Sequence, residues 1–93
     1  MNHLEPSVGF VIASEYRKRI LRALEKSTMT PSQIAEVTEL NRPHVSRFLR
    51  ELKEAGLVRC DAPDLRKGRL YSITEQGLAV LRRVGSLEAR AKA

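Results

Sequence analysis

The chain has 93 residues and a mass of 10.5 kDa, which suffices for one small domain and excludes a two-domain enzyme. Its 17 Lys and Arg outnumber its 11 Asp and Glu, so the net charge is +6, and most of the basic residues are Arg. Because a guanidinium group can bind a phosphate or a guanine edge through two hydrogen bonds, this balance favours nucleic acid as the partner.

The composition argues against several other kinds of site. Cys60 is the only cysteine, and His3 and His44 are the only histidines, so the sequence offers no intramolecular disulfide and no plausible set of zinc ligands. We therefore expect no metal, no cofactor and a location in the reducing cytoplasm. The longest apolar run, residues 8–13, is too short to span a bilayer, and no basic segment precedes it as in a signal peptide. We expect no association with a membrane.

Residues 1–13 form an N-terminal arm with no clear helical signal. His3, Pro6 and Gly9 discourage a regular helix, whereas residues 10–12 are too apolar to remain in water. We expect this arm to pack on another surface, and a partner subunit is one candidate.

A first helix is predicted after this arm. Ser14 is a favourable N-cap, and Glu15 suits the positive end of the helix dipole. Apolar residues recur at helical spacing until about Ser27, namely Tyr16, Ile20, Leu21 and Leu24. Thr28 and Met29 then leave room for no more than a minimal strand.

Two short capped helices follow, joined by a tight turn. Thr30, Pro31 and Gln33 form a capping box with Pro at the first helical position, and they begin the second helix. Its expected buried stripe is Ile34, Ala35 and Val37. Asn41 caps the third helix, which ends at Gly56. The expected inner face of this helix is Val45, Phe48, Leu49 and Leu52.

The remaining residues predict a hairpin and a last helix. Residues 57–60 and 69–73 are short β-prone runs, and the turn-rich segment 61–68 between them gives the hairpin a basic tip. Thr74 caps the last helix, which continues through Leu87. Its apolar positions are Leu78, Leu81 and Val84.

This order of elements is that of a winged helix-turn-helix domain, and the chain resembles the small archaeal winged-helix transcription regulators related to the MarR type. The matching segments are TPSQIA at 30–35, PHVSR at 43–47, LKEAGLV at 52–58 and GRLYSIT at 68–74. The resemblance implies an α+β, mostly helical fold with a three-helix core, a β-hairpin wing and a C-terminal helix. It also implies a transcription regulator that binds double-stranded DNA.

We divide the chain into the arm 1–13, a winged helix-turn-helix domain 14–74 and a C-terminal helix 75–93. The last helix is a candidate dimerisation element, because its apolar residues exceed what one small core needs: Leu78, Val80, Leu81, Val84 and Leu87. Together with the apolar arm they predict a homodimer that reads a pseudo-palindromic site.

One residue departs from the family pattern. The turn between the second and third helices usually carries a glycine where this chain has Glu39. If the backbone there is left-handed, Glu costs about 1 kcal/mol relative to Gly. The direction of the third helix depends on this turn.

The third helix carries the expected DNA-reading surface, since the second helix of such a motif enters the major groove. Its outward residues are Arg42, Pro43, His44, Ser46, Arg47 and Arg50. Arg42 and Arg47 can each bind O6 and N7 of a guanine, and Arg47 is the favoured reader because it lies one turn into the helix. His44 and Ser46 can reach a base or a phosphate, and Arg50 holds the DNA backbone.

Other residues are expected to position the domain on phosphates without reading sequence. Arg66, Lys67 and Arg69 of the wing approach the adjacent minor groove or backbone. Thr30 and Ser32 supply hydroxyl groups at the start of the second helix, where backbone N–H groups point outward.

Two other functions remain open. The domain can serve as a protein interaction module of a transcription or RNA-handling assembly, or as an architectural DNA-binding protein without sequence preference. We expect no enzyme, because Asp61 and Asp64 lie in a turn-forming loop without a catalytic partner.

Some residues have a structural and a functional interpretation, and the structural one is favoured. The basic residues of the first helix are a phosphate-facing patch or simply its solvated face: Arg17, Lys18, Arg19 and Arg22. Cys60 is a small buried side chain rather than a redox sensor, and Tyr71 packs in the hairpin rather than stacking on a base.

Overall fold

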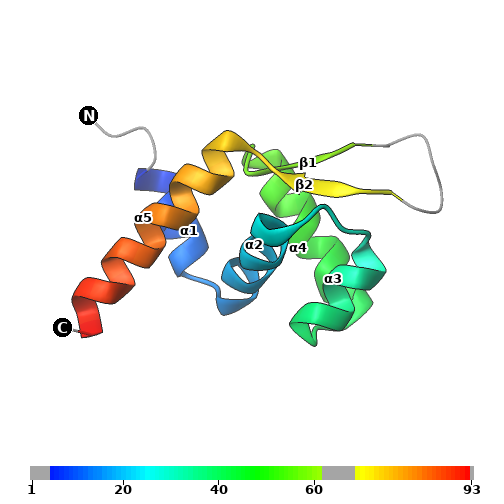
Figure 1. Ribbon diagram of the computed structural model, residues 1–93, viewed down its shortest axis with the longest axis horizontal. Helices are drawn as coiled ribbons and strands as arrows, with labels where there is room; N and C mark the ends of the chain where they lie inside the picture. The colour runs from blue at the N-terminus through cyan, green and yellow to red at the C-terminus, as the bar shows by residue number, and fades with distance from the viewer. Residues whose placement is uncertain (1–4, 62–68, 93) are drawn as a thin grey trace.

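The computed structural model describes residues 5–61 and 69–92. In these ranges the elements are α1 (Glu5–Ile12), α2 (Glu15–Lys26), α3 (Pro31–Thr38), α4 (Arg42–Glu54), β1 (Val58–Cys60), β2 (Tyr71–Ile73) and α5 (Glu75–Lys92). Figure 1 shows α1 and α5 at one end of the molecule and α3 and the hairpin at the other. This is the predicted winged helix-turn-helix arrangement, preceded by one additional helix.

The predicted caps begin the helices of the central motif. The side-chain oxygens of Ser14, Thr30 and Asn41 accept hydrogen bonds from the backbone N–H three residues on, at 3.3, 3.2 and 2.9 Å. Gln33 returns the contact, since its side chain accepts from the backbone N–H of Thr30 at 2.9 Å. These bonds satisfy N–H groups that have no partner inside the helix. The predicted starts of α2, α3 and α4 are therefore confirmed.

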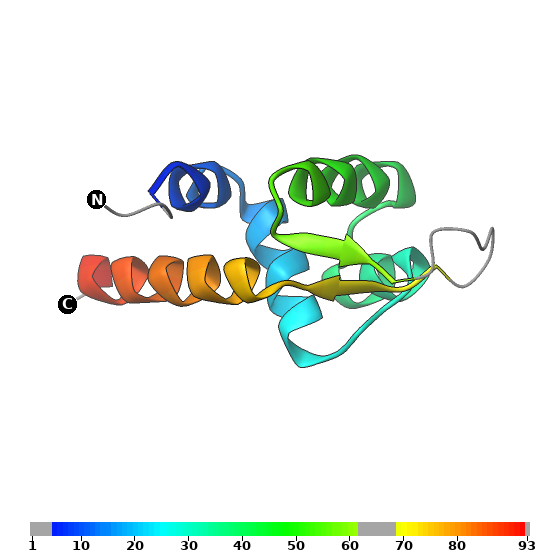
Figure 2. The ribbon, with the colours of Figure 1, turned by 90° about the horizontal axis from the view of Figure 1, so that it is seen from above.

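One continuous cluster of buried apolar side chains forms the core. Figure 2 shows α2 crossing the middle of the molecule, with α1 and α4 on one side and α5 and the hairpin on the other. The buried members are Val8, Val11, Ile20, Leu21, Leu24, Ile34, Val45, Phe48, Leu49, Leu52, Leu57, Val58, Val80, Leu81 and Val84. The inner face predicted for α4 is confirmed in full.

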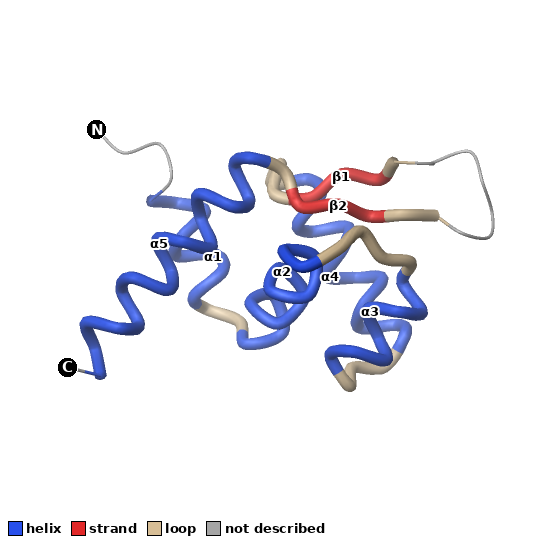
Figure 3. Tube along the Cα trace, in the orientation of Figure 1, coloured by secondary structure: helices blue, strands red, loops and turns tan. Residues whose placement is uncertain are grey.

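The hairpin is a short antiparallel pair, as predicted, with Val58 opposite Ile73 and Cys60 opposite Tyr71. Met29 adds the expected minimal strand, because its backbone exchanges two hydrogen bonds with Tyr71 at 3.1 and 2.8 Å. Figure 3 shows the loop between α2 and α3 running beside β2. These two hydrogen bonds hold Met29, and with it the start of α3, beside β2.

The prediction for the N-terminal arm was wrong in its secondary structure. Glu5–Ile12 is a helix although it contains Pro6 and Gly9. Pro6 lies in the first turn, where its missing N–H is not needed, and a side chain at position 9 would face open space. Helix formation buries Val8 and Val11, which are 2% and 0% exposed, against the rest of the core.

Three of the five apolar residues that the sequence offered for dimerisation on the last helix belong instead to the core. Val80, Leu81 and Val84 are buried within the chain, where α5 packs against α1 and α2. The helix starts at the predicted cap, since Thr74 accepts a hydrogen bond from the N–H of Gly77 at 3.0 Å, and it runs to Lys92. Leu78 and Leu87 are half-buried, so the support that α5 gives to a dimer is reduced to these two residues.

The buried stripe of α3 differs from the prediction as well. Ile34 is fully buried, but Val37 is 58% exposed, and Thr38 is buried in its place. The hydroxyl group of Thr38 can be buried because it donates to the carbonyl oxygen of Ile34 at 2.6 Å.

None of the helices in the described ranges is both long enough and apolar enough to cross a membrane.

Substitution of Gly77 by Ala tests the close contact between α5 and the hairpin. A Cβ atom there would lie 2.2 Å from the carbonyl oxygen of Leu57 and 2.7 Å from the side chain of Ile73. We expect Gly77→Ala to lower the free energy of unfolding by about 1 to 3 kcal/mol, measured by urea denaturation.

Gly85→Ala is the matched control in the same helix. A Cβ atom at Gly85 has no neighbour within 4 Å, so this substitution should raise stability by about 0.5 to 1 kcal/mol. Equal stability of the two variants would contradict the described packing of α5 on Leu57.

Candidate nucleic-acid interface

A cleft of about 720 Å³ lies where the start of α3, the outer face of α4 and strand β2 meet. We call it the basic cleft. Its lining residues are Thr30, Pro31, Ser32, Arg42, Ser46, Leu49, Arg50, Lys53, Arg69 and Tyr71. Hydroxyl groups, cations and one aromatic ring therefore share a single concave surface.

Helical spacing brings the α4 residues of the basic cleft together. Arg42, Ser46, Arg50 and Lys53 recur every three or four residues, which places them on one face of the helix. Leu49 lies at the edge of this face and is 1% exposed, so it anchors the face to the core. Pairing of Met29 with Tyr71 holds the start of α3 beside β2, and these two segments form the side of the cleft that faces α4.

The cations that α4 contributes to the cleft are exposed and unneutralised. Among the described residues, Arg42, Arg50 and Lys53 take part in no ion pair. Burial raises the pKa of Tyr71 and its neighbour Cys60 adds to the effect, while Arg69 opposes it. The ring of Tyr71 thus shares the cleft with three cations that have no internal ion pair among the described residues.

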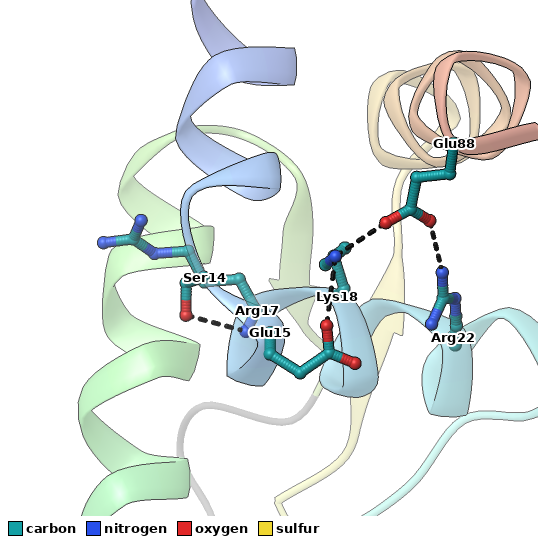
Figure 4. Close-up of polar contacts among 6 residues, drawn as sticks. All are labelled: Ser14, Glu15, Arg17, Lys18, Arg22 and Glu88. Carbon is teal, nitrogen blue, oxygen red and sulfur yellow. Dashed lines mark hydrogen bonds and ion pairs between the residues drawn. The ribbon is translucent and has the colours of Figure 1, made fainter. Parts of the chain in front are cut away.

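The cations of α2 behave differently. Lys18 and Arg22 donate to the two carboxylate oxygens of Glu88 on α5, at 2.7 and 2.8 Å, and Lys18 also pairs with Glu15 at 3.0 Å (Figure 4). The Lys18 side chain is only 12% exposed. These residues form internal ion pairs, so neither a phosphate-facing patch nor a purely solvated face describes them.

His44 and Arg47 lie away from the basic cleft. The His44 ring stacks on Tyr16 of α2, with centroids 5.9 Å apart and planes at 25°, and it meets the edge of Phe48 at 6.5 Å. The sequence placed His44 among the outward residues of this helix, but its ring packs on Tyr16, which extends from α2 to cover it. Arg47 is exposed, and its guanidinium group lies 4.8 Å from the centre of the Phe48 ring.

The basic cleft brings together six of the predicted contact residues: Thr30, Ser32, Arg42, Ser46, Arg50 and Arg69. Pro43, His44 and Arg47 lie outside it, while Arg66 and Lys67 of the wing, and Asp64, lie outside the described residues. Lys53 and Tyr71 line the cleft but were missing from the predicted set. Lys53 follows Arg50 by three residues and Ser46 by seven, and this helical spacing was the signal that could have identified it.

Asp61 stabilises the base of the wing. It accepts hydrogen bonds from the hydroxyl group of Ser72 and, at 2.8 Å, from Arg59, and Ser72 also contacts Thr28 at 3.1 Å. The hydrogen bond from Ser72 and the nearby Arg59 hold the pKa of Asp61 below its usual value. Asp61 thus has a structural role.

No group of three His, Cys, Asp or Glu side chains in the described ranges is arranged to hold a metal ion.

The turn between α3 and α4 sets the direction of the helix that carries most of the cleft. Glu39 has φ 62° and ψ 28°, which is the left-handed conformation expected if the family's glycine position is kept. Asn41 then caps α4 two residues later. The backbone of the glycine-containing turn is retained with a Glu side chain.

Comparison with known proteins identifies both a family and a fold. The profile of the family described as the HVO_A0261 N-terminal domain matches residues 6–93, whereas no curated protein matches the chain. The MarR family transcription regulator SP03579 is similar in structure at 24% identity, with a TM-score of 0.75 over 84% of this chain and 53% of that chain. ZitR of Lactococcus lactis in complex with DNA is similar at 23% identity and a TM-score of 0.69, over 83% and 53% of the chains.

A third similar structure is the transcriptional repressor BigR from Xylella fastidiosa, at 18% identity and a TM-score of 0.72, over 88% of this chain and 80% of that chain. The chain spans about half the length of SP03579 and of ZitR. At these identities the likeness is one of fold, and it confirms the predicted winged-helix architecture.

Replacing Glu39 by Gly tests the strain in the turn. A left-handed residue with a side chain costs about 1 to 2 kcal/mol, and the greater freedom of Gly in the unfolded chain offsets part of the relief. We expect Glu39→Gly to raise the free energy of unfolding by about 0.5 to 1 kcal/mol, measured by urea denaturation. Glu36→Gly, in the body of α3, should lower it, and stabilisation by both would show that backbone conformation is not the cause.

Proposed function

Because the chain belongs to the HVO_A0261 N-terminal domain family and has the winged-helix fold of MarR family regulators, we propose that it is a transcription regulator that binds double-stranded DNA. In this proposal α4 enters the major groove, and the wing lies on the adjacent minor groove or backbone. One protein of similar fold, ZitR, is described in complex with DNA, which supports the same kind of partner here.

The observation that carries the proposal is the contrast between the two sets of cations. On α2, Lys18 and Arg22 are paired with carboxylates of the same chain. On the outer face of α4, Arg42, Arg50 and Lys53 are exposed and belong to no ion pair among the described residues. Unpaired cations along a concave surface are the arrangement that a polyanionic backbone requires.

We assign two kinds of contact to α4, and we include Arg47 although it lies outside the basic cleft. Arg42, Ser46 and Arg47 lie in the first half of α4, where they can reach base edges, and an Arg there can bind O6 and N7 of guanine. Arg50 and Lys53 lie farther along the helix and suit phosphates. The hydroxyl groups of Thr30 and Ser32, at the start of α3, complete the phosphate contacts together with Arg66, Lys67 and Arg69 of the wing.

A homodimer remains part of the proposal. Its support is reduced to Ile12 on α1, which is 40% exposed, and to the half-buried Leu78 and Leu87 on α5, since the core contains Val8, Val11, Val80, Leu81 and Val84. A dimer would present one α4 to each half of a pseudo-palindromic site. The cytoplasm is the compartment in which such a regulator would work.

Incubation of the purified chain with a randomised duplex pool at physiological salt, followed by sequencing of the retained DNA, tests the function. An enriched inverted repeat would support a sequence-specific regulator that binds as a dimer, and a single enriched half-site would contradict the dimer. Salt-sensitive retention without any motif would instead indicate architectural binding. Failure to retain any duplex would reject DNA binding in favour of a protein interaction module.

The salt dependence of binding tests the role of the cleft cations. We expect Arg50→Gln and Lys53→Gln each to reduce the slope of log affinity against log salt by about 0.9, because each removes one phosphate contact. The measurement is fluorescence anisotropy of a labelled duplex over a salt series.

Arg82→Gln is the control for this measurement. It removes the same charge from an exposed position on α5 that does not line the basic cleft. Its slope should equal that of the unmodified chain. An equal reduction in all three variants would mean that net charge, rather than the basic cleft, governs binding.

A further inference from the structure

Three helices meet at the guanidinium group of Arg17, in the first turn of α2. Its Nη1 donates to the carbonyl oxygen of Phe10 on α1 at 2.7 Å, and its Nε and Nη2 donate to Oε1 of Glu51 on α4 at 3.2 and 3.0 Å. The group also lies 3.8 Å from the centre of the Phe10 ring. One charged side chain, only 18% exposed, therefore joins α1, α2 and α4.

This junction lies on the side of α4 away from the basic cleft. Glu51 follows Arg42 by nine residues, which is about two and a half helical turns, so the two side chains leave opposite sides of the helix. Figure 4 shows the Arg17 side chain directed toward α4 and away from the Lys18, Arg22 and Glu88 pairs. Arg17 is thus placed to act on the position of α4 without touching a ligand in the cleft.

The chemistry of the junction constrains direction as well as distance. Apolar contacts between α2 and α4 hold the helices together but tolerate small rotations, because they have no preferred angle. A guanidinium group has its N–H donors in a rigid plane, and charge-assisted hydrogen bonds from two of its nitrogens to one carboxylate restrict such a rotation. A Lys at this position would keep the charge and lose the planar geometry.

We propose that Arg17 is a positioning residue for DNA recognition: through Glu51 it sets the direction in which α4 presents the basic cleft, and through Phe10 it makes that direction depend on α1. This inference rests on the proposed function, because its effect is measured as DNA binding. It predicts that residues remote from the cleft control how well the chain distinguishes its preferred duplex from others.

The test uses the full chain with the fluorescein-labelled duplex enriched by the selection and with a scrambled duplex of the same length. We expect Arg17→Lys and Glu51→Gln each to weaken binding to the enriched duplex by about 2- to 30-fold, with a smaller effect on the scrambled duplex. Because both residues act through one contact, the double variant should bind the enriched duplex no more weakly than the single variant that binds it less well. The salt slope should not change, since no phosphate contact is lost.

Two control variants remove the same kinds of group from the same helices. Arg22→Lys alters an α2 guanidinium group that binds Glu88 on α5 and not α4. Glu54→Gln removes an exposed carboxylate from α4 that belongs to no ion pair among the described residues. Both should keep the ratio of affinities for the two duplexes, and melting curves establish that every variant is folded at the temperature of the titration.

The ratio of affinities separates positioning from a loss of stability. A variant that is merely less stable loses affinity for both duplexes in the same proportion, and an unchanged ratio would overturn the inference. The inference would also be overturned if Glu51→Gln and Glu54→Gln strengthened DNA binding equally, because Glu51 would then act only through its negative charge. If the unmodified chain binds no duplex, the proposed function fails and this inference falls with it. If the unmodified chain binds DNA and the Arg17 and Glu51 variants have the same ratio of affinities for the two duplexes, only the role of Arg17 is rejected.

Discussion

Burial of α2 is the constraint on which the rest of the structure depends. Helices α1, α3, α4 and α5 and strand β2 all contact it, and Ile20, Leu21 and Leu24 on its inner stripe are at most 3% exposed. Each side chain of this kind stabilises the fold by about 1.5 to 3 kcal/mol when it leaves water. Because no other helix touches so many elements, the direction of α2 determines where α4 and α5 can lie.

Burial of this helix also decides what its cations do. Arg17 and Lys18 flank the buried stripe, and their side chains are 18% and 12% exposed. A charge that has lost much of its water must find a partner of opposite sign, and Glu51 and Glu88 supply these partners from α4 and α5. The ion pairs therefore link α2 to the neighbouring helices.

The cations of α4 are subject to no such requirement. Arg42, Arg50 and Lys53 project from a face that no other described element covers, so water solvates them and no internal carboxylate is needed. The partly buried cations Arg17 and Lys18 are thus paired, whereas the exposed cations of the basic cleft on α4 are not. One group holds the helices in place, and the other remains available to an external anion.

Local signals in the sequence predicted most of the fold because they act within a few residues. The caps at Ser14, Thr30 and Asn41 depend only on a side chain and the N–H three residues on, and the inner face of α4 depends only on helical spacing. The same spacing placed Arg42, Ser46 and Arg50 on the outward side of this helix, although it grouped them with Pro43, His44 and Arg47, which lie outside the basic cleft. These features required no knowledge of what packs against them.

The errors occurred where a distant segment decides the outcome. Glu5–Ile12 has weak helical signals of its own and is a helix because α2 and α5 bury Val8 and Val11. His44 was assigned to an outward face, but Tyr16 from α2 extends over it. Val37 has helical spacing suited to burial, yet no element covers it.

The sequence by itself therefore determined the order and caps of the helices of the central motif, the inner face of α4 and the cationic character of α4, all of which follow from interactions between near neighbours. Only the tertiary structure decided which cations are neutralised and which remain available. The contacts of Arg17 with Glu51 and of Lys18 with Glu88 join residues 34 and 70 positions apart. Periodicity and capping carry no information about such pairs, because the pairs exist only after α2 has been buried.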